Sequence, residues 1–269
     1  MKEIKNTRSK SIFKKLFVKL CRLMGYEIID QNNFFIPTQN KSLNENLSIQ
    51  GSKAINLPLG EVKITRKVKS LDIIIRTCAS VGMLTQNKQR IFEQEKIEYT
   101  LRSINSIIRS IKFANQHIKN VQINLTVVDH NSGEENLSKI KKLINNSEFK
   151  YNLINLNLSE FDSKIKKTNE KNETVTSNQI SNMSNIYKSL ELSKSFDDLV
   201  YFVEDDYIHE KKSIYEMIMT YERVASQINN EIILCPTDYP YLYTQSEGTQ
   251  IFLGENYHWR RISETLCTF

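Results

Sequence analysis

Three adjacent carboxylates, Glu204, Asp205 and Asp206, directly follow the apolar run 199–203. Like charges this close repel, so a strand tip that carries all three needs a compensating cation. Mg²⁺ and Mn²⁺ bind carboxylate oxygens together with nucleotide phosphates, and such an ion neutralises the charge that develops on a departing diphosphate. We therefore expect Asp206 and Glu204 to hold Mn²⁺ or Mg²⁺. The alternative is an acidic first helical turn, but the next helix is expected to begin only near Ser213.

A second polar cluster, residues 129–133, follows the expected strand 121–128. The short carboxylate of Asp129 is suited to accept a hydrogen bond from a ribose hydroxyl or a base N–H. Ser132 is placed to cap the helix that follows, and Gly133 permits close approach of the backbone to a ligand. The alternative is that Asp129 and Ser132 only form the turn and the cap.

Two further candidates follow other expected strands. Arg76 and Thr77 end the first strand and are suited to meet a nucleotide base or a phosphate, although an ordinary loop is the alternative. Asp238 lies in the Tyr- and Pro-rich segment 235–241, which is suited to form a sugar or acceptor pocket. There the alternative is that the tyrosines pack the loop on the sheet.

The segment 254–261 holds the only tryptophan of the chain, between His258 and Arg260. The Arg260 guanidinium is a candidate to hold a diphosphate. His258 is a candidate third metal ligand or acceptor contact, but a lone histidine is more often structural.

These residues need elements to position them, and the chain from about residue 71 alternates strand-like and helix-like patterns. The expected strands are 71–77, 121–128, 151–158, 199–203 and 231–234, and the expected helices are 97–116, 134–145, 177–195 and 213–227. Such alternation, with nearly continuous apolar strands, predicts an α/β fold with a mostly parallel sheet and helices on both faces. Ligands of these sheets bind where the carboxyl ends of the strands emerge.

The N-terminal part has a different character. Residues 11–24 predict a short amphipathic helix with Lys14, Lys15, Lys19 and Arg22 mostly on one side. This pattern suits an anionic membrane surface, and packing of the helix on the main domain is the equal alternative. Residues 31–60 read as an extended linker. We therefore expect a basic helix and linker over 1–68 and the main domain over 69–269.

Charge and composition exclude several classes of protein. Residues 1–70 contain 14 Lys and Arg against 5 Asp and Glu, a net +9, so the remainder of the +6 chain carries −3. A mildly acidic main domain argues against nucleic acid as a partner. Four scattered cysteines favour a reducing cytoplasm, no apolar run reaches transmembrane length, and the N-terminus lacks the features of a signal peptide.

The order of the strand-end residues resembles that of family 2-like glycosyltransferases with the GT-A fold. The matching positions are the run from Val127 to Ser132 and the run from Val200 to Asp206. The resemblance implies a hexosyl-type, nucleotide-sugar-dependent transferase of bacterial surface glycan synthesis that acts on a glycan or lipid-linked acceptor. It also implies that Asp129 contacts the nucleoside, that Glu204 or Asp205 binds the ribose and metal, and that Asp206 binds the metal.

The same resemblance raises a question about the catalytic base. Inverting members of the family place it after a further strand, and here that strand is expected at 263–269, where the chain stops. Either the base lies elsewhere, with Asp238 as the candidate, or the chain is truncated or inactive. A nucleotidyltransferase and a non-catalytic, membrane-associated nucleotide-sugar-binding protein are the alternatives. The absence of GxGxxG and GxxxxGK[ST] motifs lowers the case for dehydrogenases and P-loop enzymes.

Overall fold

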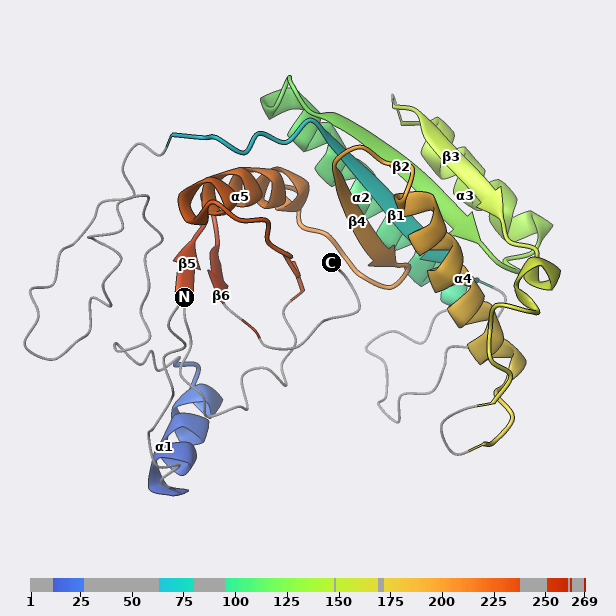
Figure 1. Ribbon diagram of the computed structural model, residues 1–269, viewed down its shortest axis with the longest axis horizontal. Coiled ribbons are helices and arrows are strands. Elements are labelled where there is room, and N and C mark those ends of the chain that lie inside the picture. The colour runs from blue at the N-terminus through green and yellow to red at the C-terminus, as the bar shows by residue number, and fades with distance from the viewer. Residues whose placement is uncertain are drawn as a thin grey trace, which may run out of the picture.

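The computed structural model of the chain describes residues 12–26, 63–79, 95–147, 149–168, 172–237, 251–260, 262 and 269 (Figure 1). The helices and strands of this part are, in chain order, α1 (Ile12–Leu23), β1 (Ser70–Thr77), α2 (Lys96–His117), β2 (Gln122–Asp129), α3 (Glu134–Asn145), β3 (Tyr151–Asn155), the 3₁₀ helix η3 (Leu158–Phe161), α4 (Ser177–Ser193), β4 (Leu199–Glu204), α5 (Ser213–Ile228), β5 (Ile251–Leu253) and β6 (His258–Arg260).

Four strands form one parallel sheet in the order β3-β2-β1-β4. Parallel strands need crossover connections, and the helices α2, α3 and α4 lie in those from β1 to β2, from β2 to β3 and from β3 to β4. Helices cover both faces of the sheet: α2 and α3 lie behind it and α4 in front of it (Figure 1). The predicted α/β fold with a mostly parallel sheet is therefore confirmed, and it is consistent with the GT-A expectation.

The hydrophobic core fills the space between the sheet and the helices α2, α3 and α5. Its strand residues alternate, because every second side chain of a strand points to the same face. Ile73 and Ile75 of β1 and Val127 of β2 are fully buried on this face, and they pack with Ile104 and Ile218 of the helices. The apolar periodicity of α2 is thus explained by burial of one side of the helix.

The face under α4 is more polar. The buried side chains of α4 are small and polar, and they recur at helical spacing: Ser181, Ser184, Asn185 and Ser189. Asn185 donates from Nδ2 to the carbonyl oxygen of Val128 in β2 (3.1 Å). The helix begins at a capping box, in which Thr176 and Gln179 exchange hydrogen bonds with each other's backbone N–H.

The prediction of a strand at 231–234 is wrong, because these residues are described and form no strand. Glu231 instead accepts a hydrogen bond from Arg66 Nε (2.8 Å). At the outer edge of β4, Phe202 exchanges two backbone hydrogen bonds with Phe269 (2.8 and 3.3 Å). Reciprocal bonds of this kind are antiparallel pairing, so Phe269 occupies the edge that a fifth parallel strand would need at this point.

Two smaller differences concern element lengths. β3 ends at Asn155 rather than at residue 158, and the chain continues into η3, where Asn157 caps the 3₁₀ turn. The antiparallel hairpin of β5 and β6 was not expected, since strands of three residues are too short to show a pattern in the sequence. Most of the strand expected at 263–269, the linker 31–60 and Asp238 lie outside the described residues.

The loop after β4 is fixed through His209. Its Nε2 lies 2.8 Å from the hydroxyl oxygen of Tyr201 in β4, and its backbone N–H donates to Ser106 Oγ of α2 (2.9 Å). Burial lowers the pKa of His209 to about 4. The loop that leaves the acidic strand end is therefore held between the sheet and α2 by a neutral imidazole.

Acidification should destabilise the domain through His209. The folded pKa lies below the unfolded value of about 6.5, so the unfolded state binds the extra proton and stability falls as the pH drops from about 6.5 to about 4. We expect a loss of about 1–2 kcal/mol between pH 7 and pH 5 relative to His209→Gln, measured by urea unfolding. Tyr201→Phe should keep most of this dependence, since burial is its main cause; equal pH slopes for wild type and His209→Gln would contradict the assignment.

Candidate active site

The carboxyl ends of β1, β2 and β4 meet at one edge of the sheet, because β1 pairs in parallel with both of its neighbours. In this register Arg76 lies opposite Glu204, and Thr77 lies opposite Asp129. Four of the residues singled out in the sequence are thus brought together by backbone pairing alone.

Strand alternation separates the acidic residues. Glu204 points to the α4 face, where its Oε1 accepts a hydrogen bond from Arg76 Nη2 (2.7 Å). Arg76 also donates from Nη1 to Asn182 Oδ1 of α4 (3.2 Å). Asp206 follows in the turn and is exposed. The pair of Arg76 and Glu204 therefore lies at the exit of two strands, beside the N-terminal half of α4.

Asp205 points to the opposite face and is buried against α2. Its Oδ2 accepts a hydrogen bond from the Thr100 hydroxyl (2.7 Å) and from the backbone N–H of Cys78 (3.4 Å). Its Oδ1 lies 3.5 Å from the ammonium nitrogen of Lys96. The described contacts of Asp205 are thus with other residues of the chain, and its contact with a nucleotide sugar stays a prediction.

These contacts change the electrostatic argument about the triplet. Arg76 on one face and Lys96 on the other each neutralise one carboxylate, so part of the compensating charge comes from the chain. Burial raises the pKa of Glu204, Arg76 opposes this shift, and the neighbouring charges of Asp206 and Asp205 add to it. Arg76 thus offsets part of the repulsion that Glu204 experiences from Asp206 and Asp205.

Asp129 is the centre of a buried hydrogen-bond network that joins the loops after β1 and β2. Its Oδ1 accepts hydrogen bonds from the hydroxyls of Thr77 (2.6 Å) and Ser132, and its Oδ2 accepts one from the Ser132 backbone N–H (3.3 Å). Ser132 Oγ in turn accepts from the backbone N–H of Ala79 (2.8 Å). Asp129 is 2% exposed. The contacts described for Asp129 are internal, so its contact with a nucleoside stays a prediction.

The expectation that Ser132 caps α3 is wrong. Gly133 occupies the N-cap position, with a φ of 78°, and no side chain makes a capping hydrogen bond there. Ser132 is engaged with Asp129 instead, and the preceding Asn131 also has a positive φ of 59°. The turn therefore bends back toward β1, which explains why Ser132 reaches Ala79 rather than the helix start.

The sequence did not predict that several other residues contribute to this edge. Thr100 and Lys96 of α2 and Asn182 of α4 hold the site carboxylates or their partner, and Ser181 Oγ lies 2.6 Å from His130 Nδ1. Burial lowers the pKa of His130. The small polar residues of α4, repeated at helical spacing, were a signal that this helix turns its polar side to the sheet.

The hairpin of β5 and β6 carries His258 and Arg260, and its described contacts are with α5 and the loop before it. Glu216 of α5, which is 2% exposed, accepts hydrogen bonds from the backbone N–H and side chain of Asn256 (2.9 and 3.0 Å). Gly254 packs so closely that a Cβ there would lie 2.0 Å from Glu216 Oε1. Among the described residues, no hydrogen bond or ion pair joins His258 to the acidic edge, and the Arg260 side chain lies outside the described part of the chain.

The residues present fit a divalent cation that a nucleotide helps to hold. Among the described residues, no group of three His, Cys, Asp or Glu side chains is arranged to hold a metal. Mg²⁺ is commonly bound by one or two carboxylates together with substrate phosphates and water, and Glu204 and Asp206 supply two carboxylates. His258 stays a predicted metal ligand and Asp238 a predicted catalytic base. Asp238 lies outside the described residues.

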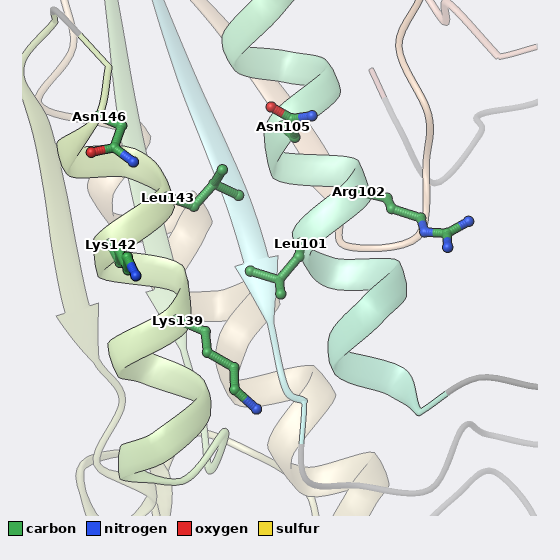
Figure 2. Close-up of a pocket in the computed structure, with 7 residues that line it drawn as sticks. All are labelled: Leu101, Arg102, Asn105, Lys139, Lys142, Leu143 and Asn146. Carbon is green, nitrogen blue, oxygen red and sulfur yellow. The ribbon is translucent and has the colours of Figure 1, made fainter.

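A groove with a volume of about 420 Å³ lies elsewhere, between α2 and α3 (Figure 2). It is lined by Leu101, Arg102, Asn105, Lys139, Lys142, Leu143 and Asn146. None of these residues is a candidate from the strand ends. The groove is therefore a separate feature of the helix surface, and the candidate site rests on the strand-end geometry.

No protein-family model and no curated protein matches the chain. Two solved structures of the galactosyltransferase LgtC match, one of an active-site mutant and one in complex with donor and acceptor sugar analogs. Each is 13% identical, with a TM-score of 0.26, and each match covers 50% of this chain and 37% of the other. The structural neighbours are thus glycosyltransferases, but a likeness this weak carries no inference about the reaction.

The two aspartates of the acidic turn should respond differently to removal of their charge. Asp205→Asn leaves Lys96 without its carboxylate partner and alters a buried hydrogen-bond network, so we expect a loss of about 1–3 kcal/mol in unfolding free energy. Asp206→Asn, at an exposed position, should change stability by less than about 0.5 kcal/mol. Urea unfolding followed by circular dichroism measures both changes. Equal losses of unfolding free energy would contradict the assignment of Asp205 as buried and Asp206 as exposed.

Proposed function

We propose that the chain is a glycosyltransferase that moves a hexosyl-type sugar from a nucleotide-sugar donor to an acceptor hydroxyl. The observation that carries the proposal is the Arg76–Glu204 ion pair at the carboxyl end of two parallel strands, with Asp206 exposed beside it. Ligands of parallel sheets bind at this edge. A guanidinium next to carboxylates offers one group for phosphate oxygens and another for a cation that accompanies them.

In this proposal Arg76 binds the donor diphosphate. Its guanidinium is already oriented by Glu204 on one side and Asn182 on the other, so little side-chain entropy is lost when a phosphate binds. Glu204 and Asp206 hold Mn²⁺ or Mg²⁺, which when bound neutralises the charge that develops on the departing nucleoside diphosphate. Burial is the main cause of the raised pKa of Glu204, and a nearby cation would relieve the further contribution that Asp206 makes to it.

The buried hydrogen-bond network of Asp129 contributes by positioning the loops around the proposed donor site. Asp129, Thr77 and Ser132 join the loops after β1 and β2, and Asp205 joins the first of these loops, through Cys78, to α2. The walls of the proposed donor site are thereby fixed before a ligand arrives, which is the condition for stabilising a short-lived charge distribution. The group that deprotonates the acceptor is proposed to be Asp238, from the sequence alone.

The proposed setting is the cytoplasm, at the face of a membrane, with a glycan or lipid-linked acceptor of bacterial surface glycan synthesis. The thiols of Cys21 and Cys78 are free, which supports a reducing compartment. None of the helices that the structure describes has the length and apolar content needed to cross a bilayer.

A panel of nucleotide sugars with Mn²⁺ tests the proposal by thermal shift and donor hydrolysis. A donor at a hundred times its Kd stabilises the folded state by about 2.7 kcal/mol, which corresponds to roughly 5–10 °C for a domain of this size. Asp206→Ala should remove the metal-dependent part of the shift. The matched control is Asp197→Ala, which removes an exposed carboxylate just before the opposite end of β4 and should keep the shift.

The outcomes separate the candidate functions. Hydrolysis and transfer with a nucleotide sugar support the transferase, whereas stabilisation without turnover favours a nucleotide-sugar-binding protein. Pyrophosphate release from a nucleoside triphosphate would favour a nucleotidyltransferase. Absence of stabilisation with every donor would overturn both enzymatic functions, and a shift that persists in Asp206→Ala would show that the metal site is wrong.

A further inference from the structure

The helix α1 exposes its apolar residues to solvent. Seven large apolar side chains on and directly after it are between 52% and 87% exposed: Ile12, Phe13, Leu16, Phe17, Leu20, Leu23 and Met24. Contiguous apolar surface of this kind on a soluble protein marks an interaction site. The helix was expected either to bind a membrane surface or to pack on the main domain, and packing of this face would have buried it.

The one buried side chain of the helix lies on its other side. At about 100° per residue, the seven apolar residues fall within an arc of about 140°, whereas Val18 lies near the middle of the remaining arc. Val18 is 7% exposed. Contact through Val18 therefore leaves the apolar arc directed outward, which is the opposite of the usual arrangement of an amphipathic surface helix.

Basic residues flank the apolar arc. Lys15 and Lys19 are exposed and follow Ile12 around the helix at the edge of the arc, and Arg22 lies beyond them. No acidic residue occurs in α1, and residues 1–70 carry a net charge of +9. Lysine stems extend along apolar surface while the ammonium groups remain in water, a geometry that suits phosphate headgroups above acyl chains.

We propose that α1 is an interfacial membrane anchor that inserts its apolar arc into an anionic bilayer surface and lies parallel to it. The 12-residue helix is about 18 Å long, too short to span a bilayer but long enough for three turns of contact. An anionic lipid surface is favoured over a second copy of the chain, because the flanking lysines of two such helices would repel each other. That this anchor brings the site to a lipid-linked acceptor rests on the proposed function; membrane binding itself does not.

Flotation of the full chain with vesicles tests the anchor. Wild type should float with vesicles of 70% phosphatidylcholine and 30% phosphatidylglycerol, less well with pure phosphatidylcholine, and less well at high salt. Lys15→Glu with Lys19→Glu should lower partitioning by at least about tenfold, since each basic residue near such a surface contributes about fivefold and two are replaced. The matched control is Lys141→Glu with Lys142→Glu on α3, which makes the same charge change and should float as wild type.

The apolar contribution needs its own variant. Leu16→Gln with Phe17→Gln and Leu20→Gln keeps good helix formers and should abolish flotation with both kinds of vesicle. Its control is Ile208→Gln with Ile233→Gln, which removes two exposed aliphatic side chains outside α1. Unchanged thermal unfolding of the triple variant shows that the domain is intact, because α1 contributes only Val18 to the buried apolar residues.

Several results would overturn the anchor. These are no flotation of wild type with anionic vesicles, equal flotation of the triple Gln variant, or a dimer in light scattering that only this variant abolishes. The last result would identify the arc as a contact between copies of the chain. None of the measurements uses a nucleotide sugar, so failure of the anchor and failure of the transferase proposal are separately visible.

Discussion

The parallel pairing of β1 with both β2 and β4 sets the positions of the candidate site residues. It brings the last residues of three strands to one edge, and it sets Arg76 opposite Glu204 and Thr77 opposite Asp129. Because side chains alternate along a strand, the same pairing sorts these residues onto two faces. The ion pair of Arg76 lies under α4, and the hydrogen-bond network of Asp129 lies on the side of the core.

The acidic turn shows how the chain tolerates three neighbouring carboxylates. Alternation directs Glu204 and Asp205 to opposite faces, and each meets a basic side chain there, Arg76 or Lys96. Burial raises the pKa of Glu204, Arg76 opposes this shift, and the charges of Asp206 and Asp205 add to it. Asp205 also joins the end of the strand to α2 through Thr100.

Two parts of the described chain carry different kinds of surface. The strand edge is polar and is fixed by buried hydrogen bonds, as a site for a charged small molecule requires. The helix α1 is apolar on its outer arc and basic beside it, as contact with a lipid surface requires. If both proposals hold, one chain combines a donor site for a soluble nucleotide sugar with an anchor near acceptors that do not leave the membrane.

The α/β fold class and most of the elements follow from the sequence, because apolar periodicity reports directly which residues are buried. The strand ends expected at residues 77, 128 and 203 lie within one residue of those observed at Thr77, Asp129 and Glu204. Sequence-based prediction failed for residues 231–234, whose apolar run packs without strand pairing, and for the short hairpin 251–260. Three outcomes became visible only in the folded chain: Asp205 faces Lys96, Asp129 is buried among internal hydrogen bonds, and Val18 rather than Leu16 or Phe17 is the buried residue of α1. Those outcomes depend on which residues of distant segments come into contact, and local spacing along one chain carries no record of that.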